Sequence, residues 1–345
     1  LSAGDLTAPE MFMFNIQSTF TNYFENQSIE FYNTYVYYKY DTLILIKGGS
    51  QSSKIKYITN QSNSLFGFSA NPAGDFNGDG YSDFIIGAPA HSNGQAFEGA
   101  FYMVYGAPNG GISRTNFHQY NAVGRDSSLG CSISNAGDID GDGFGDVIIG
   151  ASETYRTVGV AKVLNGSTSV YNILPKQELN YRPTCSTTFA RKFGDVVTNI
   201  GDINGDGYSD AAVSGGVFQT SCEISNGRVV IYLGTPNGYD TVPNRVLIGN
   251  NNDGTFGRKI RDAGDINRDG FDDFLIGCSN ARNLQGNTTN VGRVYVYYGS
   301  NTGVNIGATQ LLLAPVNVGS AITSRFGSSV SGAGDMNGDG FADII

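Results

Sequence analysis

One acidic nine-residue stretch occurs five times in this chain of 345 residues and restricts what the chain can fold into. Oxygen-bearing side chains stand at positions 1, 3, 5 and 9 of every copy, and position 6 is always glycine. Calcium takes about six to eight oxygen ligands, and a glycine turn lets a short loop wrap several of them around one ion. We therefore predict about five Ca²⁺ sites. The copies are Asp75–Asp83, Asp138–Asp146, Asp202–Asp210, Asp265–Asp273 and Asp335–Asp343.

The residues around these stretches exclude an EF-hand. That loop ends in a bidentate Glu at position 12 and lies between helices. Here position 12 is apolar in the four copies that reach it, and short β-branched runs follow each copy, which predict buried strands. The ion would therefore lie in a tight turn between two strands. The alternative is a set of Asp/Asn/Gly hairpin turns without metal. Crowded carboxylates repel one another unless a cation neutralises them, which favours the metal.

The acidic stretches belong to a longer repeat of 63, 64, 63 and 70 residues. Each unit has an apolar residue followed by glycine nine residues before the acidic stretch, then an apolar strand, Gly-Ala-Pro or a variant, an alternating aromatic strand and a fourth strand. Four strands per unit without helical periodicity predict an all-β propeller built from four-stranded antiparallel blades. The residue pairs before the stretches are Phe66-Gly67, Leu129-Gly130, Phe193-Gly194, Phe256-Gly257 and Phe326-Gly327.

We expect residues 1–345 to form a single propeller domain in which about five to six blades are represented. Residues 1–64 lack an acidic stretch, and Ser2–Phe14 is interpreted as an eroded copy. Residue 1 is Leu and the last residue falls inside a strand, so we expect a fragment of a longer propeller. The predicted units are 1–64 (degenerate), 65–128, 129–192, 193–255, 256–325 and 326–345 (the first half of a further blade).

The ordered Phe-Gly pair, DxNxDGxxD stretch and Gly-Ala-Pro resemble the FG-GAP repeat, the blade of the seven-bladed propeller at the head of integrin α subunits. The resemblance is good over 65–345 and weak over 1–64. Departures are Leu129, the missing Gly-Ala-Pro in the third and fourth units, and Arg268 at position 4, which should point away from the ion. The resemblance implies calcium binding through side chains at positions 1, 3, 5 and 9 and the carbonyl of position 7. These residues are Asp75, Asn77, Asp79, Tyr81 and Asp83; Asp138, Asp140, Asp142, Phe144 and Asp146; Asp202, Asn204, Asp206, Tyr208 and Asp210; Asp265, Asn267, Asp269, Phe271 and Asp273; and Asp335, Asn337, Asp339, Phe341 and Asp343.

The resemblance also implies a ligand face opposite the calcium loops and an extracellular location. There we expect an extracellular protein or glycan as partner. The resemblance places Cys185 in the connector that enters one blade and Cys222 in a ligand-face loop of the same blade, and we predict a disulfide between them. Cys131 and Cys278 fall in strands, where a buried thiol is the ordinary interpretation. The aromatic side chains at position 7 are expected to pack against the neighbouring blade.

Composition excludes several function classes. Sixteen of the 31 acidic residues occupy ligand positions, and five divalent ions would balance the formal net charge of −10, so nucleic acid is not expected as a partner. No apolar run is long enough to span a bilayer. The sequons at Asn26, Asn60, Asn165 and Asn287 permit glycosylation but occur easily by chance.

We expect no enzyme, because the two histidines, His91 and His118, share no catalytic motif. His91 is expected in a solvated loop. Two functions remain open at this stage. The first is a calcium-stabilised, non-catalytic adhesion or recognition module similar to an integrin α head. The second is an accessory or carbohydrate-binding propeller of a secreted enzyme of the phospholipase or polysaccharide-lyase type.

Overall fold

The computed structural model of the chain describes residues 13–14, 34–35, 42–46, 54–58, 61, 63–94, 96–107, 111–121, 128–152, 159–169, 173–181, 192–215, 218–219, 224–225, 227–250, 253, 255–282, 291–313 and 324–345. Every regular element in these residues is a β-strand, which confirms the predicted all-β class. No helix that could cross a membrane is found in the same ranges.

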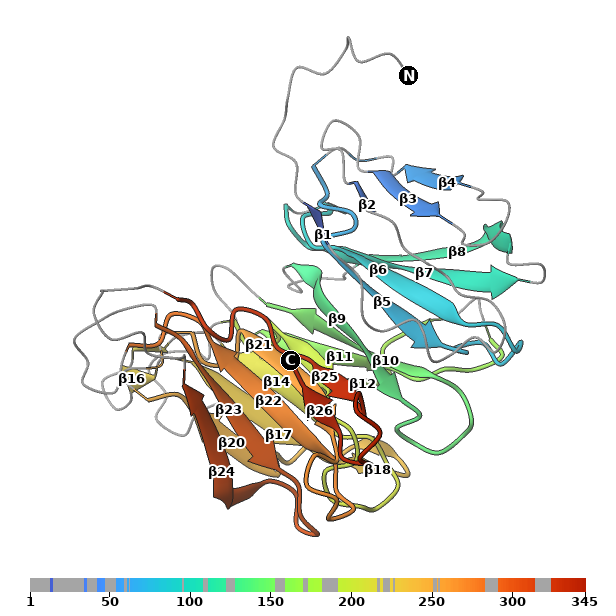
Figure 1. Cartoon of the computed structure of the whole chain (residues 1–345). Coiled ribbons are helices and arrows are strands. Elements are labelled where there is room, and N and C mark those ends of the chain that lie inside the picture. Colours follow the sequence, from blue (N-terminus) through green and yellow to red (C-terminus); the bar gives the residue numbers. More distant parts are fainter. Residues whose placement is uncertain are drawn as a thin grey trace.

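Four four-stranded antiparallel sheets follow one another along the chain, and in each sheet the strands lie side by side in chain order (Figure 1). Sheet one contains β5 (Ser69–Gly74), β6 (Asp83–Ala88), β7 (Ala100–Ala107) and β8 (Gly111–Asn121). Sheet two contains β9 (Leu129–Gly137), β10 (Asp146–Ala151), β11 (Val160–Leu164) and β12 (Gln177–Leu179). Sheet three contains β13 (Val197–Asn199), β14 (Ala211–Gly215), β17 (Arg228–Tyr232) and β20 (Arg245–Ile248). Sheet four contains β21 (Lys259–Gly264), β22 (Asp273–Cys278), β23 (Arg293–Tyr298) and β24 (Asn305–Leu313).

Shorter pairs complete the described strands. A two-stranded sheet of β25 (Gly332–Gly334) and β26 (Asp343–Ile344) follows sheet four. Near the N-terminus, β1 (Met13–Phe14) pairs with β2 (Thr34–Tyr35), and β3 (Thr42–Ile46) pairs with β4 (Lys54–Ile58). The remaining pairs are β15 (Phe218–Gln219) with β16 (Ile224–Ser225) and β18 (Gly234–Thr235) with β19 (Gly238–Tyr239).

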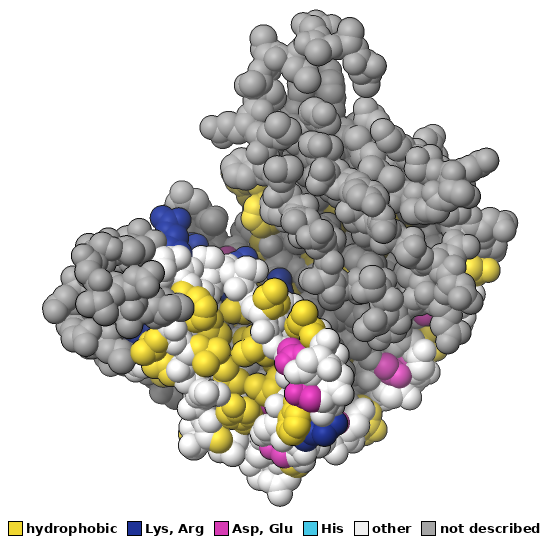
Figure 2. Space-filling model, viewed as in Figure 1, with side chains coloured by type: hydrophobic (Ala, Val, Ile, Leu, Met, Phe, Trp, Pro, Cys, Tyr) yellow, Lys and Arg dark blue, Asp and Glu magenta, His cyan; other side chains and the backbone are white. Residues whose placement is uncertain are grey.

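The sheets stack face to face and share apolar cores. The second strand of each sheet is mostly apolar and buried on both faces. The third strands are also largely buried, although they include Lys162, Arg228 and Arg293. Ile85 and Phe101 of sheet one pack with Val147 of sheet two. Similar cores join sheet two to three, sheet three to four, and sheet four to the β25–β26 pair. In Figure 2 hydrophobic side chains gather over sheet four, the sheet that packs against β25–β26.

The Phe-Gly and Gly-Ala-Pro motifs meet where two sheets join. A side chain on Gly87, the glycine of Gly-Ala-Pro in sheet one, would come within 2.0 Å of the carbonyl oxygen of Gly130 in sheet two. Gly150 stands in the same relation to Gly194, and Gly277 to Gly327. Only glycine permits this approach of two backbones. The Phe of the motif packs edge-on against an aromatic residue of the third strand, as Phe66 does with Tyr102 at 4.8 Å between ring centroids.

The first strands of the sheets lie next to one another: β5, β9, β13, β21 and β25 follow in succession. Polar side chains join them across the junctions. Ser69 Oγ donates to the carbonyl of Gly130 at 2.6 Å, and Val197 N donates to Ser132 Oγ at 3.0 Å. Each acidic stretch connects a first strand to a second strand, so all five lie at the same end of the sheets. The loops after the second strands lie at the opposite end.

Candidate metal centre

The five acidic stretches form five turns of one design, which we number one to five in chain order. The first carboxylate folds back over the turn and accepts two backbone N–H bonds. In turn one, Asp75 Oδ1 accepts from Asp79 N and Asp75 Oδ2 from Gly80 N, both at 2.9 Å. The same two bonds recur at Asp138, Asp202, Asp265 and Asp335. These bonds hold the position 1 carboxylate against the backbone of positions 5 and 6.

Positions 3 and 5 are also tied together. In turns one, three, four and five, the Asn at position 3 donates from Nδ2 to the carboxylate of position 5. The other oxygen of that carboxylate accepts the N–H of position 7, as Asp79 Oδ1 does from Tyr81 at 2.9 Å. Oxygen atoms of positions 1, 3 and 5 are therefore held within one short turn.

The aspartate at position 9 has a role that the sequence analysis missed. It connects the start of its turn to the end of the third strand in the same sheet. Asp210 Oδ2 accepts from Ile203 N at 2.9 Å, and Asp210 Oδ1 accepts from Gly234 N at 2.7 Å. Asp83, Asp146 and Asp273 make the same pair of bonds, with Gly106, Gly166 and Gly299 as the distant donors.

These distant donors are glycines for a steric reason. A side chain on Gly234 would come within 2.5 Å of the carbonyl oxygen of Ser209, and Gly106, Gly166 and Gly299 are crowded in the same way. The sequence did carry a signal: three alternating aromatic stretches, Gly99–Gly106, Gly227–Gly234 and Gly292–Gly299, each end in such a glycine. The sequence could not connect these glycines with the position 9 aspartates, because the contact depends on the pairing of the second and third strands.

Burial disfavours the ionised form of the position 9 carboxylates when no cation is bound. Asp83, Asp146 and Asp273 each have a pKa raised to about 7, and Asp210 has a pKa raised to about 8. Loss of water is the main cause, and nearby aspartates of the same turn raise the pKa further. The backbone N–H bonds oppose the shift. In turns one to four a bound cation would therefore stabilise the ionised form of the position 9 carboxylate.

Turn two has the most acidic oxygen cluster. Its carboxylates of Asp138, Asp140 and Asp146 have oxygen atoms within 4.8 Å of one another. Among the described residues, no other group of three His, Cys, Asp or Glu side chains is as close. Asp140 Oδ2 accepts from Asn165 Nδ2 at 2.5 Å, whereas Asp140 Oδ1 is buried without a hydrogen-bond partner. A buried carboxylate oxygen without a donor is costly unless a cation contacts it. This set of hard oxygen atoms fits Ca²⁺.

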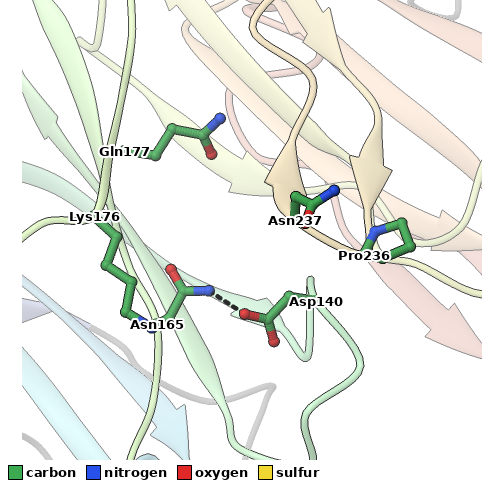
Figure 3. A pocket seen from close by; sticks show the side chains of 6 residues that line it. All are labelled: Asp140, Asn165, Lys176, Gln177, Pro236 and Asn237. Atoms are coloured by element: carbon green, nitrogen blue, oxygen red, sulfur yellow. Dashed lines mark hydrogen bonds between the residues drawn. The ribbon is translucent and has the colours of Figure 1, made fainter.

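A polar recess of about 370 Å³ lies beside turn two, between sheets two and three. Figure 3 shows Asp140 and Asn165 pointing toward each other on one side, with Pro236 and Asn237 across from them. Lys176 and Gln177 complete the lining. Asp140 is therefore reached from a recess open to solvent. Asn165 also begins a sequon. Its side-chain nitrogen, the atom to which a glycan would be attached, donates a hydrogen bond to Asp140.

Neighbouring turns contact one another through positions 4 and 7. A side chain on Gly78, at position 4 of turn one, would come within 2.3 Å of the Phe144 ring, at position 7 of turn two. Tyr208 meets Gly141 and Phe271 meets Gly205 in the same way. At three junctions a backbone N–H bond joins position 8 of one turn to position 1 of the previous turn. The expectation that the position 7 aromatic residues pack on the neighbouring blade is confirmed for these three.

Arg268 replaces glycine at position 4 of turn four and extends over the next turn. Its guanidinium lies 4.6 Å from the Phe341 ring centroid, and its Nε donates to the carbonyl of Gly340. Its φ of 60° is a left-handed conformation that costs a non-glycine residue about 1–2 kcal/mol. The cation–π contact offsets part of that cost. The side chain thus reaches toward turn five instead of folding over its own turn.

The other candidate residues fall in different places. The prediction of a solvated His91 is wrong: its side chain is buried, with Nε2 3.0 Å from Gln119 Nε2, and burial lowers its pKa. The turn after β6 brings His91 against Gln119 of β8, a contact that the sequence could not show. Cys131 and Cys278 are free thiols in β9 and β22, and burial raises both pKa values, that of Cys131 to about 11. Cys185, Cys222, the side chain of His118 and the sequons at Asn26, Asn60 and Asn287 lie outside the described residues.

The comparisons with known proteins agree with the resemblance stated from the sequence. A model of the FG-GAP repeat matches residues 66–102 and 262–297, so the chain contains this repeat in at least two places. These segments include turns one and four, and turns two, three and five have the same hydrogen-bond design.

The chain is similar to several integrin α subunits. It is 29% identical over 226 residues to integrin alpha-5 of Xenopus laevis, which covers 64% of this chain and 20% of that protein. It is 30% identical over 226 residues to integrin alpha-V of Gallus gallus, with the same coverage. With integrin alpha-IIb of Mus musculus it is 28% identical over 241 residues, which covers 67% of this chain and 21% of that protein. The matched part thus spans about a fifth of each subunit.

Contact between turns predicts how position 4 tolerates a side chain. Gly78→Ala places a methyl group against Phe144, whereas Gly338→Ala has nothing within 4 Å of the added carbon. The φ values are nearly the same, 70° and 73°, so both variants share the left-handed penalty of about 1–2 kcal/mol. We expect Gly78→Ala to lower the free energy of unfolding by about 1–3 kcal/mol more than Gly338→Ala. Denaturant unfolding in calcium measures both, and equal losses would contradict the packing of turn two on turn one.

Proposed function

We propose that this chain is a calcium-binding, non-catalytic recognition module that acts outside the cell, in the manner of an integrin α head. The observation that carries the proposal is the repetition of one turn design five times, with carboxylate and amide oxygens gathered in each. The buried, unpartnered Asp140 Oδ1 of turn two adds to it. The similarity to integrin α subunits supports the same function.

The residues that would hold the ion are the side chains at positions 1, 3, 5 and 9 with the carbonyl of position 7. In turn two these are Asp138, Asp140, Asp142, Phe144 and Asp146. The position 9 oxygens already accept N–H bonds, but a carboxylate oxygen has two lone pairs and can contact a cation as well. The bound ion would supply positive charge that keeps the carboxylates ionised. The turns would then stay rigid and hold the first and second strands of each sheet.

Recognition is assigned to the opposite end of the sheets. The acidic turns occupy one end and are packed against one another, so their side chains are committed to the turns. The loops that follow the second strands lie at the other end, next to the starts of the first strands. A protein or glycan ligand would bind there, while calcium keeps the sheets in place. In this scheme calcium is structural, and the module has no catalytic step.

Calcium titration tests the proposal directly. Asp206→Ala removes the position 5 carboxylate of turn three, and we expect the number of bound ions to fall by one relative to the unchanged protein. Asp240→Ala, an exposed aspartate of the same repeat unit outside the turns, should leave the number unchanged. Each site with a Kd near 10⁻⁴ M would contribute about 1.4 kcal/mol at millimolar calcium, so a chelator should lower the melting temperature by many degrees. Equal stoichiometry in both variants, or a melting curve unaffected by chelator, would refute calcium binding at the turns.

The raised pKa values predict an opposite pH response with and without calcium. Asp83, Asp146, Asp210 and Asp273 have folded-state pKa values of about 7 to 8, against about 3.9 for an unfolded aspartate. Between these values the folded state binds more protons than the unfolded state, so stability falls as pH rises. In chelator we expect the melting temperature to fall from pH 5 to pH 8. In calcium the ion holds the carboxylates ionised, and this fall should disappear. The same downward slope in both buffers would show that these carboxylates do not meet the ion.

A further inference from the structure

Two cationic side chains lie on one face of β21, the first strand of sheet four. Lys259 and Arg261 are two residues apart in β21, so both side chains point to the same side of the strand. Ile260 between them is buried, whereas both cations are exposed. A third exposed cation, Arg258, comes immediately before the strand. This group of positive charges is notable in a chain whose formal net charge is −10.

Neither Lys259 nor Arg261 has an anionic partner in the part of the chain that the structure describes. Arg261 Nη1 donates to the carbonyl of Ile260 at 2.8 Å, which leaves its charge unneutralised. The adjacent Asp262 points away by strand alternation and accepts from Gly264 N at 3.0 Å. Its pKa is raised to about 6 by burial, not lowered by a cation. By contrast, Arg293 of the same sheet is buried and paired with Asp253 at 3.2 Å.

Both charged groups are exposed, although neighbouring atoms remove part of their water. Loss of water lowers the pKa of both Lys259 and Arg261, and the charge of Arg261 lowers that of Lys259 further. The side chains nevertheless keep contact with solvent. The neighbouring segment, residues 328–334, contains only Ser, Val, Gly and Ala, so it offers no acidic side chain to these cations. Two like charges about 7 Å apart on one face of a strand repel each other and favour an anion from outside.

The corresponding positions in other sheets have a different role. Lys259 pairs with Gly277 across the sheet as Ser69 pairs with Gly87, and Arg261 matches Asn71. Ser69 and Asn71 donate to carbonyls of sheet two, and Ser132 and Ser134 accept N–H bonds from sheet three. These small polar side chains fasten one inner strand to the next. Sheet four has long cations in place of this fastening, so a purely structural role does not account for them.

Lys259 and Arg261 lie toward the end of β21 that is remote from turn four, because the turn follows Gly264 at the other end of the strand. Figure 1 shows β21 close to β25, and the two strands contact each other. We infer that Lys259 and Arg261 form a carboxylate-binding site for an acidic side chain of a protein partner. This inference rests on the proposed recognition function and specifies the chemistry of its ligand.

A single carboxylate fits the charge distribution better than a long polyanion. The cations are confined to the start of one strand, and the acidic turns give the molecule as a whole a negative field without bound calcium. A polyanion such as a sulfated glycan needs an extended basic surface. The guanidinium of Arg261 presents parallel N–H donors that match a carboxylate, and Lys259 adds a point charge about 7 Å further along the strand.

The test uses a fluorescein-labelled hexapeptide that contains one Asp and one Glu among glycines, with its Asn/Gln counterpart as a neutral probe. Fluorescence polarisation is measured in millimolar calcium for the unchanged protein and for three variants. Lys259→Gln/Arg261→Gln removes both charges, and Lys259→Arg keeps them. Arg245→Gln removes an exposed cation of β20 and serves as the matched control. Melting temperature and calcium stoichiometry of each variant are measured in the same samples to confirm folding.

We expect the acidic peptide to bind the unchanged protein, Lys259→Arg and Arg245→Gln alike, and the double variant at least about tenfold more weakly. The neutral peptide should bind none of them measurably. Equal binding by the double variant, or equal binding of the neutral peptide, would overturn the site. Failure of the acidic peptide to bind, together with capture of a heparin oligosaccharide that the double variant loses, would replace it with a sulfated-glycan site. Normal calcium stoichiometry in any of these cases would leave the metal-binding proposal standing, because the turns are measured independently.

Discussion

The two hydrogen bonds of the position 9 aspartate are the interaction on which the rest of the structure depends. Through one oxygen the carboxylate fixes the start of its turn, and through the other it holds the glycine after the third strand, 20 to 26 residues further along the chain. One side chain thereby joins three strands of a sheet at a single point. In turns one to four it is fully or almost fully buried, so it brings a charge into the protein that needs a counter-ion. Structural order and the demand for a cation thus come from the same residue.

The turns also connect one sheet to the next. Glycine at position 4 leaves room for the aromatic residue at position 7 of the following turn, and backbone bonds run alongside these contacts. At the other end of the sheets, the glycines of Phe-Gly and Gly-Ala-Pro bring two backbones together. Between these two ends, polar side chains of the first strands form hydrogen bonds from one sheet to the next. A disturbance of one turn is therefore expected to reach its neighbour.

Sequence alone predicted the parts of this arrangement that repeat along the chain. The acidic spacing gave the turns between first and second strands, and the aromatic runs gave the third strands, because both patterns are local. It did not predict what depends on contacts between segments about 60 residues apart. The need for glycine at position 4 comes from the contact of Gly78 with Phe144, which belongs to the next turn. The bond of Asp210 with Gly234 likewise depends on the pairing of strands within the sheet. His91 was misplaced because a turn that looks polar in sequence is buried by its neighbours. Lys259 and Arg261 stand out only beside Ser69 and Asn71 in the same register.

The central claim is that each acidic turn holds one calcium ion and that these ions keep stacked β-sheets in place for recognition at their other end. Anomalous diffraction at a long X-ray wavelength, from crystals grown in calcium, examines it most directly. The account predicts one anomalous peak in each of the five turns, surrounded by the oxygens of positions 1, 3, 5 and 9 and the carbonyl of position 7. Turns without peaks, with the same hydrogen bonds intact, would show that the carboxylates serve as structural caps alone.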